Sequence, residues 1–481
     1  MRMPTEADMS QEQTDIYIEA PLNGKILVTG PPGTGKTVIA FLRAHTVSKK
    51  KGDVAIAMFQ NVLKQYASNA SENKFTVCTI HSWWRNWWMN FALSPNGNSS
   101  PIKGKLGSKE VIFLPGCSGM KRKEVDELFG QPFKNRGKSI GIPFNNLQKT
   151  WCVWKDYYDS NSDLFKFYAT PKDKLPMMGE YGEEGSLDHN FEKIIDYLYQ
   201  NKEQIESDKV NWGHLIIDES QDMSPELHST LKFISSQFLK DMPEKNAPAI
   251  SLFADENQRL NPNNSTIKDI LEAHDIPDER HYKLSRNYRN TLEIAKLASH
   301  FYVGLPTGVP NLPEENTGEK PKLASKPNMK ETIEFIFNYA TNHENEEIGI
   351  FVQNHSQRKK YVKAIDKKIK DASNEKLSVQ SYEYRDLEWG DANKLKFDEG
   401  GTISIFSRHM SKGLEFDAVF IVEMQSISVE PSAIDEFRMG MYVLTSRART
   451  NLYLMLNSDD ENEPAILSFL PKKEENIIEY E

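Results

Sequence analysis

A glycine-rich segment near the start of the chain has the residue types and the spacing of a phosphate-binding loop. It reads Gly30-Pro-Pro-Gly-Thr-Gly35-Lys36-Thr37 and fits the pattern G-x-x-x-x-G-K-[ST]. Its glycines let backbone N–H groups turn toward phosphate oxygens, its lysine neutralises their charge, and the adjacent hydroxyl can ligate Mg²⁺. We therefore predict that this segment binds ATP and that Thr37 ligates Mg²⁺. The predicted ATP contacts are Gly30, Pro31, Pro32, Gly33, Thr34, Gly35, Lys36 and Thr37.

Two adjacent carboxylates follow an apolar run much later in the chain. The run is His214-Leu-Ile-Ile217, and Asp218 and Glu219 come directly after it. Open parallel sheets bind ligands at the carboxyl ends of their strands, so a strand here would deliver both carboxylates to such a site. We predict that Asp218 holds Mg²⁺ through water and that Glu219 orients and deprotonates the attacking water. The structural alternative is an acidic strand end that caps a helix, and the upstream phosphate-binding loop disfavours it.

Alternating strand-like and helix-like stretches surround these residues. The phosphate-binding loop lies between an apolar run at residues 25–29 and a helical pattern at 38–47, which is the context that a nucleotide site requires. Two series of such runs predict an α/β fold class with two tandem lobes, each a parallel sheet covered by helices. The predicted strands are residues 25–29, 54–58, 214–217 and 250–254 in the first lobe and 348–352, 402–406, 418–422 and 452–455 in the second, which also has a predicted helix at 358–369.

One stretch breaks this alternation and divides the chain into domains. Residues 96–205 are rich in Gly, Pro, Lys and aromatic residues, which predicts an insertion within the first lobe. The first lobe then comprises residues 1–95 and 206–284, and residues 285–481 form the second lobe. Between residues 101 and 155 the insertion carries eleven Lys and Arg against four Asp and Glu. This excess fits either contacts to phosphates or a solvated basic face, and the sequence leaves both open.

Composition and charge exclude several classes of protein. The 481 residues are 38% hydrophobic and 27% charged, which is enough apolar material for several packed domains. No apolar run approaches the roughly 20 residues that span a bilayer, so we predict a cytoplasmic protein without a membrane partner. A net charge of −10 argues against non-specific binding of duplex DNA over the whole surface. Cys78, Cys117 and Cys152 are too widely spaced for a zinc site or a disulfide framework, and buried thiols are the simpler interpretation.

The segment Asp218-Glu-Ser-Gln-Asp222 also resembles the UvrD, Rep and PcrA type of superfamily 1 helicase. Because further matches follow in that family's order through both halves of the chain, the resemblance implies two RecA-like lobes and ATP-driven movement along single-stranded DNA, 3′ to 5′. The matching segments are Met9-Ser-Gln-Glu-Gln13 for the Q motif, Asp255-Glu-Asn-Gln258 for motif III, Leu284-Ser-Arg-Asn-Tyr288-Arg289 for motif IV, His409-Met-Ser-Lys412-Gly413-Leu-Glu415-Phe416 for motif V and Tyr442-Val-Leu-Thr-Ser-Arg447-Ala for motif VI.

The resemblance assigns nucleotide contacts to the matching positions. It implies that Gln13 reads the adenine edge and that Tyr288 stacks on the base. Gln258 is expected to sense the γ-phosphate. In motif V, Gly413 and Glu415 are further candidates for nucleotide binding.

Two arginines are predicted to complete the site from the other lobe. Arg289 and Arg447 occur late in the chain, so both would lie on the second lobe and reach a γ-phosphate bound in the first. A guanidinium is always charged and donates in a planar fork, which suits the spread charge of the transition state. ATP would then close the cleft between the lobes, and hydrolysis would open it. The full predicted catalytic set is Lys36, Asp218, Glu219, Gln258, Arg289 and Arg447.

A third group of residues is predicted to contact the nucleic-acid strand. By resemblance these residues lie in two motifs of the first lobe and in motif V, and short polar side chains on strand-end loops are suitable phosphate ligands. Four tryptophans between positions 83 and 88 have i, i+4 helical spacing and are either stacking platforms or core, with core the more common fate. The predicted strand contacts are Phe59, Asn61, Thr79, His81, His409 and Lys412.

The chain departs from the helicase pattern in two places. Gln258 is followed by Arg259-Leu-Asn-Pro-Asn-Asn264 rather than by aromatic residues that stack on bases, which weakens the case for processive unwinding. Only 123 residues separate Arg289 from Gly413, so no large insertion is expected in the second lobe. In this compact layout the chain is similar to the helicase-like subunit of the Gabija anti-phage system. That similarity implies a Gabija-like nuclease subunit as a partner in a hetero-oligomer.

Three functions fit these patterns. The leading hypothesis is an ATP-dependent helicase or translocase, stimulated by single-stranded or partly duplex DNA, in anti-phage defence or DNA repair. The alternative is a switch subunit that senses ATP or DNA and activates a partner nuclease with little unwinding. The third is an unrelated P-loop NTPase that acts on small molecules or proteins, for which Arg447 would be irrelevant to hydrolysis. ATPase assays with and without oligonucleotide, beside a strand-displacement assay, distinguish the three.

Overall fold

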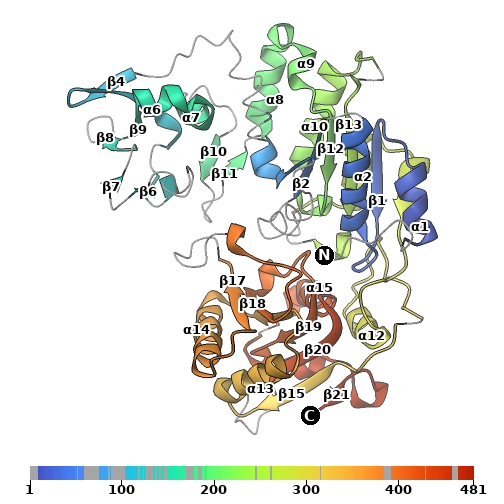
Figure 1. Ribbon diagram of the computed structural model, residues 1–481. Coiled ribbons are helices and arrows are strands. Elements are labelled where there is room, and N and C mark those ends of the chain that lie inside the picture. Colours follow the sequence, from blue (N-terminus) through green and yellow to red (C-terminus); the bar gives the residue numbers. More distant parts are fainter. Residues whose placement is uncertain are drawn as a thin grey trace. The chain divides into compact units, whose positions relative to one another are not determined.

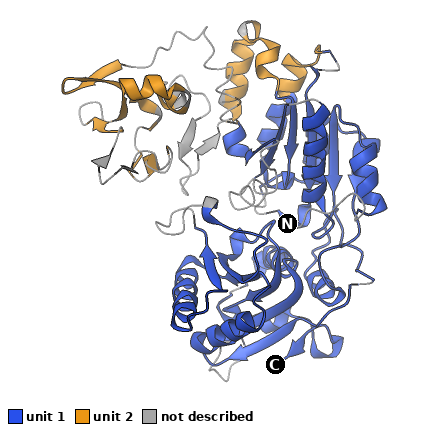
Figure 2. Ribbon diagram, viewed as in Figure 1, with its two compact units in different colours: residues 1–83, 212–232, 243–481 blue, residues 84–211, 233–242 orange. Residues whose placement is uncertain are grey.

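The computed structural model of the chain divides into two compact units, coloured blue and orange in Figure 2. The first unit comprises Met1–Trp83, Trp212–Lys232 and Pro243–Glu481, and the second comprises Trp84–Asn211 and Phe233–Met242. The structure describes residues 9–50, 53–58, 75–84, 87, 103–117, 120–122, 124–125, 129, 134–135, 138–139, 142–145, 150–169, 178–181, 187–189, 191–243, 246–259, 263–314, 316–383, 392–427, 429–457 and 464–481.

The first unit contains two parallel sheets (Figure 1). The first of them has the strand order β14-β1-β13-β12-β2-β3. Strands β2, β12 and β13 are buried along their whole length, as expected where helices cover both faces of a sheet. The strands are β1 (Lys25–Thr29), β2 (Val54–Met58), β3 (Thr76–Thr79), β12 (His214–Ile217), β13 (Ala249–Ala254) and β14 (His281–Lys283), and the helices of this lobe include α1 (Gln11–Thr14), α2 (Lys36–Lys50), α10 (Pro225–Phe238) and α11 (Ile267–His274).

The second sheet forms the other lobe of this unit and has the order β17-β18-β16-β19-β20-β15-β21. Its pairings are all parallel. The strands are β15 (Lys322–Lys326), β16 (Ile348–Val352), β17 (Ser378–Ser381), β18 (Thr402–Ser407), β19 (Phe416–Ile421), β20 (Ala448–Asn457) and β21 (Glu479–Tyr480), and the helices include α12 (Leu292–His300), α13 (Met329–Asn342), α14 (His355–Asp371) and α15 (Ile434–Thr445).

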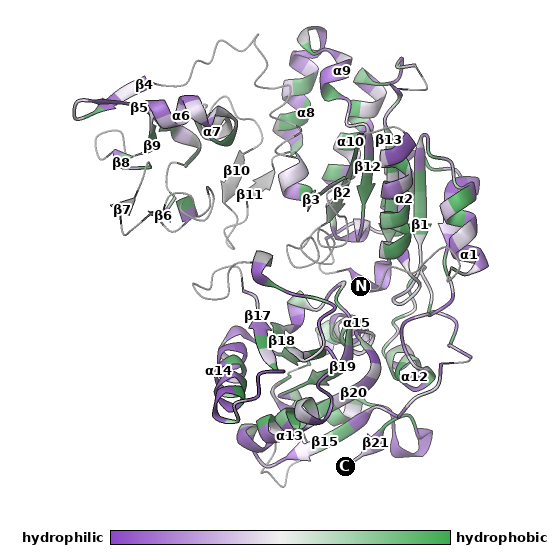
Figure 3. Cartoon of the chain, viewed as in Figure 1, coloured by the Kyte–Doolittle hydropathy of each residue, from purple (hydrophilic) through white to green (hydrophobic). Residues whose placement is uncertain are grey.

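The helices of the second lobe cover its sheet with one apolar face each. Helix α14 is rich in lysine, yet Tyr361, Val362 and Ile365 are buried and belong to the same core cluster as residues of β16 and β18. Figure 3 shows this division, with hydrophobic residues in the strands and hydrophilic residues along the helices. Among the described residues, no helix combines the length and the apolar character needed to cross a bilayer.

The predicted α/β fold class is confirmed, because two parallel sheets flanked by helices are present in the predicted places. The predicted strands at 25–29, 54–58, 214–217 and 348–352 coincide with β1, β2, β12 and β16, and the other predicted strands differ from the observed ones by one to four residues at an end. Five strands of these two sheets were not predicted, namely β3, β14, β15, β17 and β21. All of these except β15 lie at a sheet edge, where short or partly exposed strands lack a long apolar run, and β15 has a lysine at each end.

The second unit contains the predicted insertion at residues 96–205 and is centred on an antiparallel sheet of the order β4-β5-β9-β8. Two further pairs, β6-β7 and β10-β11, are also antiparallel. The strands are β4 (Lys103–Leu106), β5 (Lys109–Leu114), β6 (Lys134–Asn135), β7 (Lys138–Ser139), β8 (Phe144–Asn145), β9 (Thr150–Trp154), β10 (Met178–Tyr181) and β11 (Leu187–His189), and the helices are α6 (Lys155–Ser160), α7 (Ser162–Ala169), α8 (Phe191–Gln200) and α9 (Ser207–Val210).

Two of the four clustered tryptophans pack inside this unit. Trp84 is fully buried and stacks on Trp87, with ring centroids 4.9 Å apart. The Trp87 indole donates a hydrogen bond to the carbonyl of Val210 at 2.9 Å. These rings pair at i, i+3 spacing and act as core, while Trp88 lies outside the described residues.

Candidate nucleotide site

The phosphate-binding loop is the turn that connects β1 to α2, and two of its glycines adopt a left-handed backbone. Gly33 has φ +81° and Gly35 has φ +86°. A Cβ atom on Gly33 would lie 2.3 Å from Oδ1 of Asn287, and one on Gly35 would lie 2.5 Å from Nε2 of Gln13. Backbone and packing therefore both require glycine, because the loop is pressed between the Q-motif segment and the motif IV segment.

Lys36 begins α2 and is buried under this loop. Its Nζ donates to the carbonyls of Gly30 at 2.6 Å and Pro31 at 3.1 Å. Burial lowers the pKa of the Lys36 ammonium, and the nearby carboxylates of Asp255 and Glu219 oppose that effect. The ammonium is thus held among loop carbonyls and acidic side chains, where it can meet the charge of a bound phosphate.

Thr37 and Asp218 form the pair that fits a magnesium ion. The Thr37 hydroxyl donates to Oδ2 of Asp218 at 2.8 Å, although the two residues come from different elements, α2 and the end of β12. Mg²⁺ is usually bound through one or two protein oxygens together with substrate phosphates and water, and this pair supplies such oxygens beside the phosphate-binding loop. Among the described residues there is no group of three or more His, Cys, Asp or Glu side chains that could hold a metal ion.

Glu219 follows Asp218 in a backbone conformation that is unusual for a residue with a side chain. It has φ 55° and ψ 45°, in the left-handed region, and precedes a short 3-10 helix, η7 (Ser220–Asp222). Gln221 supports this turn, since its Nε2 donates to Oε2 of Glu219 at 2.6 Å and its Oε1 accepts from the backbone N–H of Asp255 at 2.9 Å. The turn therefore holds the carboxylate in one orientation.

The pKa values of the two adjacent carboxylates shift in opposite directions. Burial, followed by repulsion from Glu219, raises the pKa of Asp218, and the hydrogen bond from Thr37 opposes this shift. Burial alone would raise the pKa of Glu219 too, but attraction to Lys412 and Lys36 outweighs it and lowers that pKa. Environments that separate the pKa values of neighbouring acids are common in catalytic sites, and this one keeps Glu219 ionised.

Arg447 and Gln258 connect the two lobes. The guanidinium of Arg447 donates to Oε1 of Gln258 at 3.0 Å and to the carbonyl of Val443 at 2.8 Å. The amide of Gln258 in turn donates to Oδ2 of Asp255 at 2.7 Å. Burial and the neighbouring Arg289 lower the pKa of Arg447 to about 9, so its guanidinium stays charged at neutral pH. A glutamine expected to sense the γ-phosphate is thus bonded to an arginine expected to contact it.

Arg289 is held by a carboxylate of the second lobe. Its Nη2 lies 2.9 Å from Oε1 of Glu415, and the same carboxylate lies 3.4 Å from Nε of Arg449. Burial would raise the pKa of Glu415, but the two guanidinium groups lower it to about 2. Glu415 therefore carries a full negative charge and fixes the direction in which Arg289 points.

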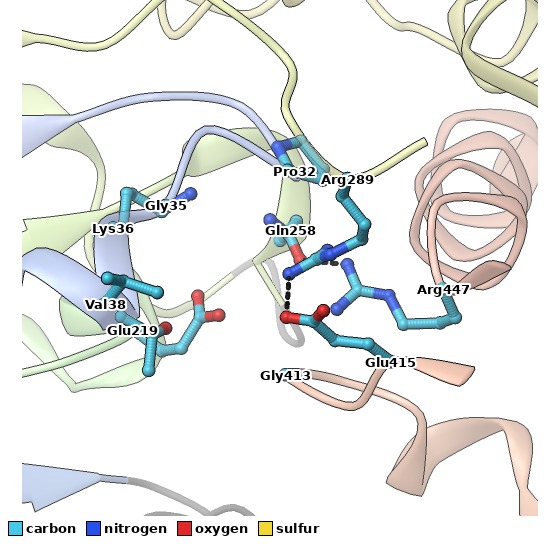
Figure 4. A pocket seen from close by; sticks show the side chains of 12 residues that line it. Pro32, Gly35, Lys36, Val38, Glu219, Gln258, Arg289, Gly413, Glu415 and Arg447 are labelled. Carbon is cyan, nitrogen blue, oxygen red and sulfur yellow. Dashed lines mark hydrogen bonds and ion pairs between the residues drawn. The ribbon is translucent and has the colours of Figure 1, made fainter. Parts of the chain in front are cut away.

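One cleft of about 370 Å³ is lined by these groups (Figure 4). Lys36 and Glu219 lie on its first-lobe side, and Arg289 and Arg447 lie across from them. A phosphate chain at the loop would therefore face both guanidinium groups, although the segment that carries Arg289 packs directly against Gly33 of the loop. The lining residues are Pro32, Gly33, Gly35, Lys36, Thr37, Val38, Glu219, Gln258, Arg289, Gly413, Glu415 and Arg447.

The residues predicted to bind adenine lie at the other end of the loop. Gln13 is buried, its Nε2 donates to the carbonyl of Thr34 at 3.0 Å, and its Oε1 accepts from the backbone N–H of Ser10 at 3.1 Å. Tyr288 is 40% exposed, with the guanidinium of Arg286 5.5 Å from its ring centre. An exposed ring that already stacks with a cation is a suitable platform for a base.

Lys412 was predicted to contact the strand, and the structure places it inside the protein. It is 2% exposed, and its Nζ lies 2.6 Å from Oδ2 of Asp222 and 3.7 Å from Oε2 of Glu219. It also donates to the backbone carbonyl of Gln258. The ammonium therefore joins the motif V segment to the turn of the first lobe that carries Glu219 and Asp222, and its observed partners are protein carboxylates.

The other predicted strand contacts are distributed unevenly. Thr79 is buried at the end of β3, where its hydroxyl accepts from the backbone N–H of Ser82 at 3.2 Å. His81 is partly exposed next to it. His409 is exposed and lines a second cleft. Phe59 and Asn61 lie outside the described residues.

Sequence reasoning missed several residues that hold the site together. Asp222 ends the segment that begins at Asp218, but no role was predicted for it, although it forms the ion pair with Lys412. Arg449 received none either, although it shares Glu415 with Arg289. The sequence offered a sign of Asp222, because this third acid follows Asp218 and Glu219 within the same short segment. Nothing in the sequence links Arg449 to Glu415.

Comparison with known proteins adds independent observations. A family model described as an AAA domain matches residues 13–264, which is more than half of the chain, and one described as a UvrD-like helicase C-terminal domain matches residues 383–459. No curated protein matches the chain. Among solved structures, the C-terminal domain of a possible DNA helicase from Lactobacillus plantarum WCFS1 is 16% identical and covers 40% of this chain and 98% of that chain. Its TM-score of 0.28 is too low to establish a shared fold.

Proposed function

Because this chain belongs to the AAA domain family and its second lobe matches the C-terminal domain of UvrD-like helicases, we propose that it is a motor that uses ATP to move along single-stranded DNA. The two matches together support a UvrD-like helicase of superfamily 1. The finer proposal is a Mg²⁺-dependent ATPase stimulated by nucleic acid, which moves 3′ to 5′ and works in an anti-phage or repair complex with a nuclease subunit.

The observation that carries this proposal is the cleft that both lobes line. The phosphate-binding loop and Glu219 belong to the first lobe, and Arg289 and Arg447 face them from the other side. Glu219 would accept the proton of the attacking water, while Lys36 and the two guanidinium groups would stabilise the charge on the transferred phosphoryl group. Mg²⁺ held by Thr37 and Asp218 would neutralise phosphate charge when bound.

Direct bonds between the lobes explain how hydrolysis could become movement. Arg447 bonds to Gln258, and Lys412 bonds to Asp222, so both contacts join the second lobe to residues around Glu219 and the γ-phosphate position. A change in phosphate state alters what Arg447 and Gln258 contact, and it therefore alters how the lobes are held. Two arrangements of this kind, exchanged once per ATP, are what a strand-moving motor requires.

The decisive experiment measures ATP hydrolysis with single-stranded DNA, duplex DNA, RNA and no nucleic acid at several salt concentrations. The proposal expects stimulation by single-stranded DNA that weakens as salt rises, because phosphate contacts release counterions. Equal hydrolysis with and without every nucleic acid would refute the motor.

A second candidate is a switch subunit that licenses a nuclease without unwinding. The observation that favours it is the segment 259–264, which follows Gln258 and lacks the aromatic residues that commonly continue this motif in helicases and stack on bases. The switch predicts DNA-stimulated hydrolysis without displaced strand. Duplexes tailed on the 3′ or the 5′ side therefore test displacement and polarity in one experiment, beside the ATPase measurement.

A further inference from the structure

Arg449 is not among the described residues that line the nucleotide cleft, yet its guanidinium contacts three carboxylates close to it. Its Nη1 lies 3.1 Å from Oδ1 of Asp417 and 3.7 Å from Oε2 of Glu347, and its Nε lies 3.4 Å from Oε2 of Glu415. Clusters of partly buried charges often contribute little net stability, because desolvation offsets the attraction between the charges. A role other than stability is therefore worth seeking for this arginine.

An irregularity in the strand pairing places Arg449 among these acids. The register between β19 and β20 shifts between Phe416 and Ala418. The shift leaves Arg449 and Thr450 together opposite Asp417, and the Thr450 hydroxyl donates to the carbonyl of Asp417 at 2.8 Å. An extra residue of this kind redirects side chains, and such irregularities are common next to active sites. The local backbone is thus built to direct Arg449 toward the acids.

Glu415 is held by two guanidinium groups, one at each oxygen. Its Oε1 lies 2.9 Å from Nη2 of Arg289, and its Oε2 lies 3.4 Å from Nε of Arg449. Two contacts of this kind fix the rotation of the carboxylate, whereas one contact alone leaves it free to turn. Arg449 therefore fixes Glu415, and Glu415 in turn fixes Arg289.

Arg289 has a donor left over for a ligand. Its Nη2 is engaged by Glu415, while its Nε–H is buried and has no hydrogen-bond partner among the described residues. Because buried polar atoms are normally paired, this donor in the lining of the cleft fits an oxygen of a bound phosphate. The direction of that donor depends on how firmly Glu415 is held.

Arg449 also changes the charge that a phosphate would meet. Glu415 lines the cleft together with Arg289, and its low pKa of about 2 keeps it ionised. A carboxylate paired with Arg289 alone would cancel the charge of that guanidinium and would repel a phosphate. Arg449 neutralises Glu415 from its other oxygen, so the charge of Arg289 remains available to the phosphate.

We propose that Arg449 is a positioning residue for ATP hydrolysis, which acts on the γ-phosphate only through Glu415 and Arg289. The proposal deepens the proposed function and rests on the assignment of this cleft to ATP, but it does not require movement along DNA. The competing explanation is an ion cluster that serves only to stabilise the second lobe.

The test uses Arg449→Gln beside a matched control, Lys322→Gln. Lys322 lies on β15, the neighbour of β20, and is 21% exposed at its side chain, compared with 24% for Arg449. It also pairs with two carboxylates, Glu319 at 3.5 Å and Glu481 at 3.1 Å, and neither of them lines the nucleotide cleft. Both variants lose a partly buried cation, but only one of these cations contacts Glu415.

Two measurements separate positioning from stability. Arg449→Gln should lower kcat for ATP hydrolysis about tenfold and reduce the preference for a non-hydrolysable ATP analogue over ADP about fivefold. Its affinity for ADP should stay within about twofold of the wild type, because ADP has no γ-phosphate, and this binding also shows that the variant is folded. Lys322→Gln should leave all three quantities within about twofold. Unchanged kcat and unchanged preference in Arg449→Gln would overturn the proposal.

A double variant tests whether Arg449 acts through Arg289. In protein that already carries Arg289→Gln, adding Arg449→Gln should change kcat and the analogue preference by less than about twofold, because no guanidinium remains to be positioned. A further tenfold loss would mean that the two arginines act independently, and the proposal would then be wrong. If Arg449→Gln does not bind ADP, Arg449→Lys takes its place, with a smaller loss that should likewise vanish in the Arg289→Gln protein.

The same measurements, made with and without single-stranded DNA, keep this proposal separate from the motor function. Coupling between Arg449 and Arg289 without stimulation by DNA would leave the positioning role intact while the motor function fails. Stimulation by DNA with additive losses would have the opposite meaning. If the wild type hydrolyses no ATP, the proposed function fails, and the analogue preference in the single and double variants still decides the role of Arg449.

Discussion

The turns that follow β12 in the first lobe and β19 in the second have nearly the same construction. Each places a glutamate in the left-handed region two residues after its strand, Glu219 at φ 55° and Glu423 at φ 57°, and each continues into a 3-10 helix. In each, the glutamine two positions later donates to that glutamate, at 2.6 Å from Gln221 and 2.8 Å from Gln425. The glutamine also accepts from a backbone N–H at the end of the neighbouring strand, Asp255 after β13 or Asn457 in β20.

The surroundings of the two glutamates differ sharply. Glu219 follows an aspartate and lies 3.7 Å from the ammonium of Lys412, in a cleft with further cations. Glu423 follows Val422, and its carboxylate accepts from neutral donors, the Tyr361 hydroxyl at 2.9 Å and the Asn457 amide at 2.6 Å. The turn is thus a scaffold that both lobes use. What we propose as catalytic is the set of cations and the metal-binding pair around one of its two copies.

The largest expected difference concerns the two carboxylates themselves. Glu219→Gln should lower kcat for ATP hydrolysis by about 10²–10⁴-fold, because it removes the proton acceptor while preserving the shape of the side chain. Binding of ATP should persist, since the phosphate-binding loop is unchanged. Steady-state kinetics and equilibrium binding of a fluorescent ATP analogue measure the two effects.

Glu423→Gln is the matched control for that experiment. It makes the same chemical change in the same turn, and ATP hydrolysis should stay within about twofold of the wild type because no phosphate site adjoins it. Comparable losses in both variants would mean that the turn matters only through stability, and the assignment of Glu219 would then be wrong.

Loss of the charged donor beside the first turn should reduce stability more than loss of a neutral donor to the second turn. Lys412→Met should cost about 3–5 kcal/mol of unfolding free energy, because it leaves the buried carboxylate of Asp222 without its cation. Tyr361→Phe, which removes a neutral donor from Glu423, should cost only about 1–2 kcal/mol. Urea unfolding followed by fluorescence gives both values.

A double variant separates the ion pair from general packing. Lys412→Met combined with Asp222→Asn removes both charges, so part of the lost stability should return. If the double variant is as unstable as the sum of the two single variants, the pair does not act as a unit and the contrast with the neutral turn disappears.

The parts of this site that depend on local sequence could be predicted, and the parts that depend on distant contacts could not. The loop at Lys36 and the pair Asp218-Glu219 sit directly beside apolar strands, so pattern and spacing located them. The bond between Arg447 and Gln258 joins residues 189 positions apart, and the pair of Lys412 with Asp222 joins residues 190 apart. A single sequence holds no record of such partners.

The same reasoning explains which strands were not predicted and why the observed partners of Lys412 were not. Edge strands such as β17 pair on one side only and need no continuous apolar run, so their sequences resemble loops. Lys412 occupies a motif position that implied a strand contact, yet the side chain turns toward Asp222 because a nearby carboxylate pairs with its ammonium inside the protein. The repeated turn was invisible as well, since Glu-Ser-Gln and Glu-Met-Gln are unremarkable as sequences.

Acidification should destabilise the turn after β12, because a histidine is bonded to it and the turn after β19 has no such bond among the described residues. The carbonyl of Ser220 can only accept, so Nε2 of His228, 3.2 Å away, carries the hydrogen and Nδ1 accepts from His274 at 3.0 Å. Burial lowers the pKa of His228 from 6.5 to about 4. Its stabilising contribution is therefore complete above pH 6.5 and is lost as the pH falls toward 4, by on the order of 3 kcal/mol.

Thermal unfolding across that pH window tests the assignment. His228→Gln keeps one donor for Ser220 and one acceptor for His274 but does not titrate. It should match the wild type above neutral pH and lose less stability on acidification. An unchanged acid slope in this variant would show that other groups control the pH response.

The smallest predicted effect distinguishes the structural role of the two turns from the proposed role of the first turn in ATP hydrolysis. Gln221→Ala and Gln425→Ala each remove two equivalent hydrogen bonds, so each should cost about 1–3 kcal/mol of unfolding free energy. Only Gln221→Ala should also lower kcat, because Glu219 then loses the amide that orients it while its partner Lys412 remains. Rescue by Gln221→Asn is not expected, since the shorter side chain cannot reach both Glu219 and Asp255. If Gln425→Ala lowers kcat as much as Gln221→Ala does at equal stability, the second turn is coupled to hydrolysis and is more than a scaffold.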